Sequence, residues 1–245
     1  MKETIQIRAG LEAQYPDVYT RSALGAVRVL APFDRDVKSL MRSRIERRRA
    51  RFRDHQRIAF LDPDATIGRT SIKVRDARAG AFDGCEIPPD LQRQWIQGTG
   101  PAAKPGVSLE RSIRNVAYAL LSGADGWMFD GEDALGQTRT MSLENQRNLK
   151  LAIARDDVFL SSSKGVAAEM NTWSEGFLGR TIVPAWREQL DFTTVIFRAR
   201  GLHLDDRHIR NADGSGFSAS IVDACLYVTN NHARLLGAGR SIVLY

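Results

Sequence analysis

Between Ser108 and Tyr245, segments with helical spacing of apolar residues alternate with short apolar runs typical of strands. The first helix is predicted from Leu109 to Leu121, with Ser108 as its N-cap and Gly123 near its end. Strands that alternate with helices in this way form parallel βαβ units. This part of the chain is therefore predicted to be an α/β structure whose sheet is either open or closed into a barrel, since periodicity does not distinguish the two.

The other elements are predicted from the same signals. Strands are expected at 127–130, 193–198 and 241–245, and helices at 142–153 and 218–235, with a partly helical segment at 156–190 and a polar loop at 199–217. The first 60 residues are predicted to be mostly helical. Residues 61–107 are expected to be irregular because proline- and glycine-rich turn signals interrupt them. The chain therefore divides into a helical and irregular N-terminal part and a later α/β part.

Two of the predicted strands run directly into charged residues. Asp130, Glu132 and Asp133 follow the apolar run Gly126–Phe129, and Arg198 follows the next run of the same kind. Sites in α/β folds are built at the carboxyl ends of the strands. We therefore expect the three carboxylates and the guanidinium at one rim. There the acids could bind a divalent metal, hold an arginine, or act as general acid or base.

Composition narrows the class of protein. With 43% hydrophobic and 26% charged residues, the composition is that of a soluble globular protein. No apolar run approaches the roughly 20 residues that span a bilayer, so no membrane partner is expected. Cys85 and Cys225 are far apart and match no metal-ligand spacing. A disulfide scaffold is therefore not expected, and a cytoplasmic location is the default.

Much of the net charge of +6 comes from the arginine-rich segment Arg42–Arg53. Such a cluster could be a nucleic-acid patch, the solvated face of a helix, or a response to an anionic cofactor such as a coenzyme A phosphate, which nothing in the sequence locates. We favour the solvated face, because Leu40, Met41 and Ile45 form an apolar stripe and no aromatic residue lies between Arg42 and Ala50 to stack on a base. No nucleic-acid partner is therefore expected.

Taken in order, these motifs resemble malate synthase, in particular its shorter A-type form. The matching pieces are Thr99-Gly100-Pro101, Ala117–Ala124, Met128–Asp133, Phe197–Leu204, Ser218–Ser220 and Ile242–Tyr245. The resemblance implies that residues 1–100 form a mainly helical and irregular segment with the arginine-rich helix. It also implies that residues 101–245 form the first part of a (β/α)8 TIM-type barrel, cut before completion. A chain that ends on a bare apolar strand agrees with this expectation.

The resemblance also implies a reaction, the Claisen-type condensation of acetyl-CoA with glyoxylate to give malate and CoA. Arg198 would be the catalytic guanidinium, and Asp130, Glu132 and Asp133 would line the same pocket and orient it. Mg²⁺ is the implied cofactor, but the family's magnesium ligands and its catalytic aspartate lie on parts that this chain does not match. We therefore expect no condensation by this polypeptide alone. Gly131 departs from the family, which usually has a bulkier residue there.

Two rival functions stay open at this point. A citrate lyase-like or aldolase-like barrel lyase shares acidic boxes and a strand-end arginine on the same architecture. A non-catalytic binding or regulatory fragment is the other rival, with the arginine-rich helix on nucleic acid, and its sign would be a steep salt dependence of binding. The sequence does not predict an oligomeric state.

Overall fold

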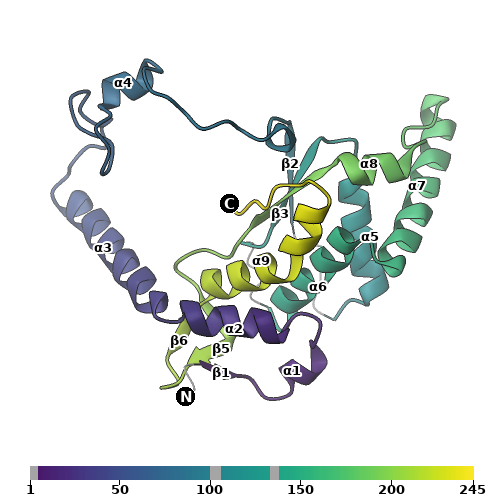
Figure 1. Ribbon diagram of the computed structural model, residues 1–245, viewed down its shortest axis with the longest axis horizontal. Coiled ribbons are helices and arrows are strands. Elements are labelled where there is room, and N and C mark those ends of the chain that lie inside the picture. Colours follow the sequence, from purple (N-terminus) through teal and green to yellow (C-terminus); the bar gives the residue numbers. More distant parts are fainter. Residues whose placement is uncertain (1–4, 100–105, 133–137) are drawn as a thin grey trace.

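The computed structural model describes residues 5–99, 106–132 and 138–245 (Figure 1). The residues Gly100, Pro101 and Asp133, which entered the sequence analysis, lie outside this described part. The described residues form a mixed α/β structure with two three-stranded sheets. Its N-terminal elements are β1 (Ile5–Ile7), α1 (Leu11–Gln14), α2 (Arg21–Leu30), α3 (Phe33–Arg53), α4 (Val74–Arg78) and the 3-10 helix η1 (Pro89–Leu91). The mainly helical start that the sequence predicts is confirmed, with the addition of one short strand.

A parallel sheet of β2 (Trp95–Thr99), β3 (Gly126–Asp130) and β4 (Thr194–Arg198) carries the predicted rim. The pairing is in register, so that Thr99, Asp130 and Arg198 lie side by side at the carboxyl ends of the three strands. The prediction of parallel strands is confirmed for β3 and β4. Strand β2 was missed, because its sequence ends in the Gly98–Pro101 turn signal.

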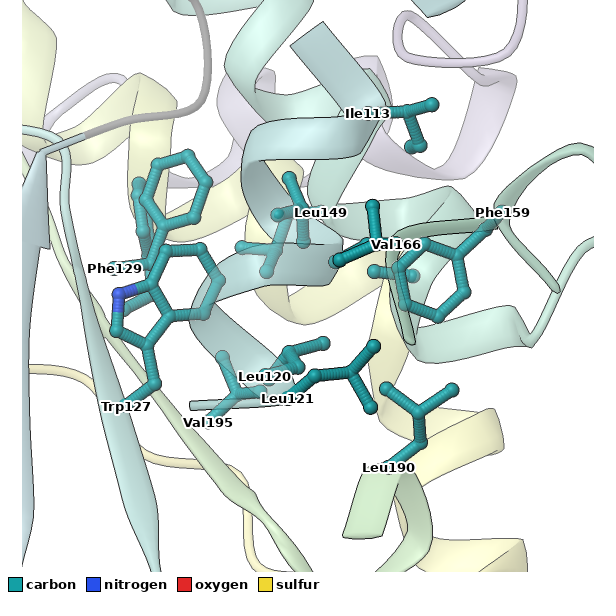
Figure 2. Packing of buried hydrophobic residues seen from close by; sticks show 14 of the residues in the cluster. Ile113, Leu120, Leu121, Trp127, Phe129, Leu149, Phe159, Val166, Leu190 and Val195 are labelled. Carbon is teal, nitrogen blue, oxygen red and sulfur yellow. The ribbon is translucent and has the colours of Figure 1, made fainter. Parts of the chain in front are cut away.

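The helices that pack around this sheet are α5 (Leu109–Leu120), α6 (Met141–Ala154), α7 (Asp157–Leu178), α8 (Trp186–Phe192) and α9 (Ala219–Gly237). Trp127 and Phe129 of β3 and Val195 and Phe197 of β4 lie in one cluster with residues of these helices. Figure 2 shows Trp127 and Phe129 on one side of Leu120 and Leu149, and Phe159 on the other. Full burial of such side chains stabilises the fold by about 1.5–3 kcal/mol each, and so fixes the sheet that carries the rim.

An antiparallel sheet, in the order β1-β5-β6, joins the N-terminus to the segment after β4. Strand β5 (Asp205–Asn211) pairs with β1 on one side and with β6 (Gly216–Ser218) on the other. The prediction of a polar loop from 199 to 217 is therefore wrong for residues 205–211 and 216–217, which form strands. The turn in this hairpin uses Gly214 at a φ of 81°, a left-handed conformation that glycine adopts without steric cost.

Two of the predicted helices begin at the serines that the sequence indicates, and of these two serines only Ser108 caps its helix through the side chain. Ser108 accepts a hydrogen bond from the backbone N–H of Arg111 at the start of α5, and Ser218 is the N-cap residue of α9. Ser142 is not a cap. It lies inside α6, is buried, and follows the actual N-cap residue Thr140.

The predicted barrel does not appear as a closed structure. Both sheets in the described residues are open, and the C-terminal segment forms one isolated parallel bridge, Leu244 to Phe197, in place of the predicted strand 241–245. Among the described residues, no helix is long and apolar enough to cross a membrane. The structure thus supports the α/β class and leaves the barrel as a proposal.

Helix α3 extends away from the rest of the molecule in Figure 1. Asp34, in its first turn, is its one buried residue among those described. The Asp34 carboxylate accepts hydrogen bonds from the backbone N–H and the hydroxyl of Ser218, at 2.8 and 2.7 Å. Burial alone would raise the pKa of Asp34, but hydrogen bonds from Asn211, Ser218 and Lys38 lower it below its ordinary value. This anchor fixes the base of α3 to the body.

Candidate functional site

The carboxyl ends of β3 and β4 bring together the acids and the arginine that the sequence singles out. Asp130 and Arg198 are direct partners in the strand register. Nη1 of Arg198 donates to Oδ2 of Asp130 at 3.2 Å, and Nη2 forms an ion pair with Oε2 of Glu132. The expected juxtaposition is confirmed for these three residues. Asp133, the third predicted acid, lies outside the described residues.

Glycine at position 131 allows the two strand ends to approach closely. The backbone N–H of Gly131 donates to the carbonyl oxygen of Arg198 at 2.9 Å. A Cβ atom at this position would lie 2.7 Å from that oxygen and 2.9 Å from the ring of Phe197. The next residue turns back, because the N–H of Glu132 donates to Oδ1 of Asp130 at 3.0 Å. Glycine at this position therefore has a steric reason in this chain.

Two further side chains hold this group, and sequence reasoning missed both. Gln97 on β2 donates through Nε2 to Oδ2 of Asp130 at 2.6 Å. The ring of Tyr245 lies 5.6 Å from the guanidinium carbon of Arg198, within cation–π range. A prediction of strand β2 would have placed Gln97 next to β3, but the sequence analysis did not predict that strand. We call Gln97, Asp130, Glu132, Arg198 and Tyr245 the rim cluster.

A buried ion triad fixes the chain just beyond Arg198. Arg200 donates from its backbone N–H and from Nε to Oδ2 of Asp223, both at 2.9 Å. Its Nη2 also donates to Asp223 at 2.7 Å and to Asp206 at 2.6 Å. Burial would lower the pKa of Arg200, but the attraction of the two carboxylates raises it above its ordinary value. The triad ties β4, β5 and α9 together beneath the rim cluster.

The two histidines after β4 lie in different places. His203 and Glu132 both lie next to Gly201. A Cβ atom added to Gly201 would lie 2.7 Å from the His203 ring and 3.2 Å from the Glu132 carboxylate. His208 lies on β5 and is 2% exposed. Burial lowers the pKa of His208, which keeps the ring neutral at neutral pH. Of these two histidines, His203 is the one close to the rim cluster.

The rim cluster does not fit a magnesium site by itself. The described residues contain no group of three or more His, Cys, Asp or Glu side chains that could hold a metal ion. The two carboxylates present, Asp130 and Glu132, are both paired with Arg198. Mg²⁺ prefers octahedral oxygen ligands without a competing cation. We therefore assign no metal ligand and no metal-dependent step to these residues.

The arrangement can present N–H donors to an anion. A guanidinium carries five N–H groups, and the contacts of Arg198 with the two carboxylates use two of them. The remaining donors belong to a side chain that two carboxylates and an aromatic ring hold in place. Fixed donors of this kind stabilise negative charge that develops on a reacting oxygen. With two carboxylates and one guanidinium, the described rim carries a net charge of −1.

Comparison with known proteins gives one consistent family. No protein-family profile matches the chain. The glyoxysomal malate synthase of Zea mays is 29% identical over 241 residues, which cover 97% of this chain and 36% of the maize protein. The malate synthase of Streptomyces clavuligerus is 29% identical over 158 residues, covering 64% and 25% respectively.

The glyoxysomal malate synthase of Ricinus communis is 26% identical over 99% of this chain and 37% of its own length. The resemblance to malate synthase that the motifs indicate is thus confirmed. The chain spans about a third of the length of the plant relatives that it matches.

Proposed function

We propose that the chain is part of a malate synthase-like (β/α)8 barrel and that its rim cluster takes part in the condensation of acetyl-CoA with glyoxylate. The single observation that carries this proposal is the position of Arg198. Its guanidinium is 3.2 Å from Asp130 and paired with Glu132, at the carboxyl edge of parallel strands, where α/β enzymes build their sites. The similarity to malate synthases over nearly the whole chain supports the same reaction.

In the proposed reaction, a base removes a proton from the acetyl methyl group and leaves negative charge on the thioester oxygen. The methyl carbon then bonds to the aldehyde carbon of glyoxylate, and water cleaves the thioester to give malate and free CoA. Arg198 donates N–H groups to the enolate oxygen or the glyoxylate carboxylate. Asp130, Glu132 and, by resemblance, Asp133 orient that guanidinium. We assign the base to none of the described residues.

Mg²⁺, which the resemblance implies as cofactor, would supply Lewis-acid polarisation of the aldehyde. We propose that its ligands lie outside the residues matched here. A cytoplasmic location also remains a proposal. It is supported by Cys85 and Cys225, which are both free thiols in the structure.

Calorimetric titration with glyoxylate tests the role of Arg198. We expect saturable binding that Arg198→Gln weakens at least about tenfold, because a charge-assisted hydrogen bond is lost. Arg187→Gln on α8 is the matched control, since it removes the same charge from a side chain that lies on Trp186 and outside the rim cluster. Equal affinity in the Arg198 variant and the parent chain would remove the basis of the proposal.

Turnover is a separate measurement. Thiol release from acetyl-CoA with glyoxylate and Mg²⁺ is expected to stay at the blank level for this 245-residue polypeptide. Release well above the blank would show that these residues themselves supply the base and the metal ligands that we do not assign. Malyl and citramalyl thioesters, offered in the same assay, test the citrate lyase-like rival. Cleavage of either thioester would favour that rival.

The exposure of α3 favours one function of another class, the binding of a polyanion such as a nucleic acid. From Leu40 to Ile58 the chain carries eight arginines against Glu46 and Asp54, a net six positive charges that equal the net charge of the whole chain. Among the described residues, only Arg53 of these arginines forms an ion pair, with Asp54. The apolar stripe is also uncovered, since Leu40 is 70% exposed.

Titration of labelled duplex DNA at several salt concentrations decides this second candidate. Binding through about six phosphates would weaken about a thousandfold between 50 and 200 mM salt. A weak affinity that hardly depends on salt would leave α3 as a solvated helix.

A further inference from the structure

A second polar region lies at the end of β4 opposite Arg198. A cavity of about 480 Å³ opens beside Thr194 and Val195, the first residues of β4, where the C-terminal ends of α6, α8 and α9 meet. Three arginines line it: Arg155, Arg234 and Arg240. We call this space the arginine cavity. It shares no residue with the rim cluster.

Part of the role of these arginines is structural. Arg155 donates to the carbonyl oxygens of Ala152, at 2.5 Å, and of Leu190. Arg234 donates to Ala154 at 2.8 Å, and Arg240 donates to Phe192 at 3.1 Å. These carbonyls lie at the C-terminal ends of α6 and α8, where backbone acceptors lack partners within the helix. Capping therefore explains why cations gather here.

Capping leaves most of the donors unused. The guanidiniums of Arg234 and Arg240 each donate a single hydrogen bond among the described residues, out of five N–H groups apiece. Neither forms an ion pair within that part of the chain. Arg155 alone is paired, with Asp191 at 3.3 Å, and the Asp191 side chain is 74% exposed.

The charges around the cavity are not balanced. Its lining carries three guanidiniums and one carboxylate. The buried carboxylate of Asp90 accepts hydrogen bonds from Ser241, which also lines the cavity. The carboxylates of Asp90 and Asp191 together still leave an excess of one positive charge. Burial lowers the pKa of Arg155, and the repulsion of Arg240 and Arg234 lowers it further against the pull of Asp191. An anion between the three guanidiniums would relieve this repulsion.

Size and lining indicate the kind of molecule that fits. The volume lies within the range of about 300–1,000 Å³ that is typical of small-molecule sites, and it exceeds the needs of a lone inorganic ion. Ile153, Val195 and Leu235 contribute apolar surface beside the arginines. Guanidiniums match phosphate and carboxylate groups through paired N–H donors.

We propose that the arginine cavity binds a small organic molecule that carries a doubly charged oxyanion, a phosphate monoester or a dicarboxylate. Arg234 and Arg240 supply the contacts, and Arg155 forms the buried back of the site. Since the cavity lies at the other end of β4 from Arg198, this proposal does not depend on the proposed condensation.

Calorimetry on the full chain tests it, with inorganic phosphate and succinate as separate probes at pH 8 and at constant ionic strength set with chloride. We expect saturable binding of at least one probe, and the probe that binds more tightly identifies the class of oxyanion. Arg234→Gln and Arg240→Gln should each weaken that binding about tenfold or more.

The control variant is Arg180→Gln, an exposed arginine between α7 and α8 that does not line the cavity. It makes the same change in net charge and should leave the affinity unchanged. Arg155 is left intact because its three contacts hold helix ends together, and the unfolding midpoint of each ligand-free variant verifies its fold. Absence of saturable binding for both probes, or equal loss in the Arg180 control, would overturn the proposal.

Discussion

Asp223 on α9 accepts three hydrogen bonds from Arg200, which lies two residues beyond the catalytic candidate at the end of β4. One of these bonds comes from the backbone N–H of Arg200, so the contact fixes the main chain as well as the side chain. The course of the chain after Arg198 is therefore set by α9, an element that begins about 20 residues later in the sequence. The rim cluster depends on this buried contact without touching it.

Substitution of Asp223 should show how much the triad contributes to stability. Asp223→Asn leaves the guanidinium of Arg200 buried with one carboxylate, Asp206, in place of two. We expect a loss of about 3–5 kcal/mol in the free energy of unfolding, because breaking a buried ion pair leaves an uncompensated charge. Urea denaturation measures it. The control Asp213→Asn, in the exposed hairpin turn, should hardly move the midpoint.

Gly131 should not tolerate even one methyl group. Gly131→Ala places a Cβ 2.7 Å from the Arg198 carbonyl oxygen, so we expect a loss of about 1–3 kcal/mol and weaker glyoxylate binding. Gly165 on α7 has nothing within 4 Å of an added Cβ, and Gly165→Ala should stabilise the protein by about 0.5–1 kcal/mol. Opposite signs in thermal or urea unfolding would confirm the steric reason. Equal effects would contradict it.

His208 should make stability depend on pH. Its pKa in the folded protein lies below the ordinary value of 6.5, mainly through burial and against the attraction of Asp206. As the pH falls through 6.5, the unfolded chain therefore binds a proton that the folded protein does not yet bind. The free energy of unfolding decreases by up to about 1.4 kcal/mol per pH unit until the pKa of His208 in the folded protein is reached. Above pH 6.5 this loss in the free energy of unfolding should be absent.

Urea unfolding at pH 7.5 and pH 5.5 measures this loss. Part of the difference between the two pH values should disappear in His208→Gln. His55 is exposed, and His55→Gln is the matched control that should retain the full dependence. An unchanged pH dependence in His208→Gln would assign the effect to other groups.

The two cysteines should differ in reactivity. Burial raises the pKa of Cys225 to about 11, whereas Cys85 is exposed. A thiol reagent such as DTNB should therefore modify one cysteine rapidly in the native chain and both in denaturant. Cys85→Ser should remove the rapid phase, and Cys225→Ser should leave it unchanged. Rapid modification of two thiols in the native chain would show that α9 opens readily.

The sequence is sufficient where local patterns specify an element. Strands β3 and β4 are short apolar runs with charged ends, and Ser108 and Ser218 are the N-cap residues of α5 and α9. Strand β2 was not predicted because its apolar residues are few and because Gln97 and Gly98 follow them. Gly98 is needed there because a Cβ atom would collide with the Trp127 ring. Its partner β3 supplies the pairing that the local sequence does not encode.

The hairpin of β5 and β6 was not predicted for a related reason. The sequence of β5, Asp205–Asn211, is strongly polar, and it pairs with a three-residue strand from the other end of the chain. Its polar side chains are satisfied by long-range contacts, such as that of Asp206 with Arg200. No local pattern reports such contacts.

For the site, the prediction reached Asp130, Glu132 and Arg198 because strand ends meet at one edge. It did not reach Gln97 or Tyr245. Both depend on pairings between strands or bridges that are far apart in sequence. The arginine cavity is a similar case, since Arg155 and Arg240 converge from helix ends 85 positions apart in the numbering. Convergence of this kind follows from tertiary packing alone.

The pairing of Ile5 with Asn211 joins positions separated by about 200 residues, which has a consequence for how the protein is made. During synthesis, β1 stays unpaired until β5 has left the ribosome. Closing so long a loop is slow, and an unpaired strand edge invites contact with other chains in the meantime. Nascent chains stalled before position 205 should therefore require chaperone protection that the finished protein does without.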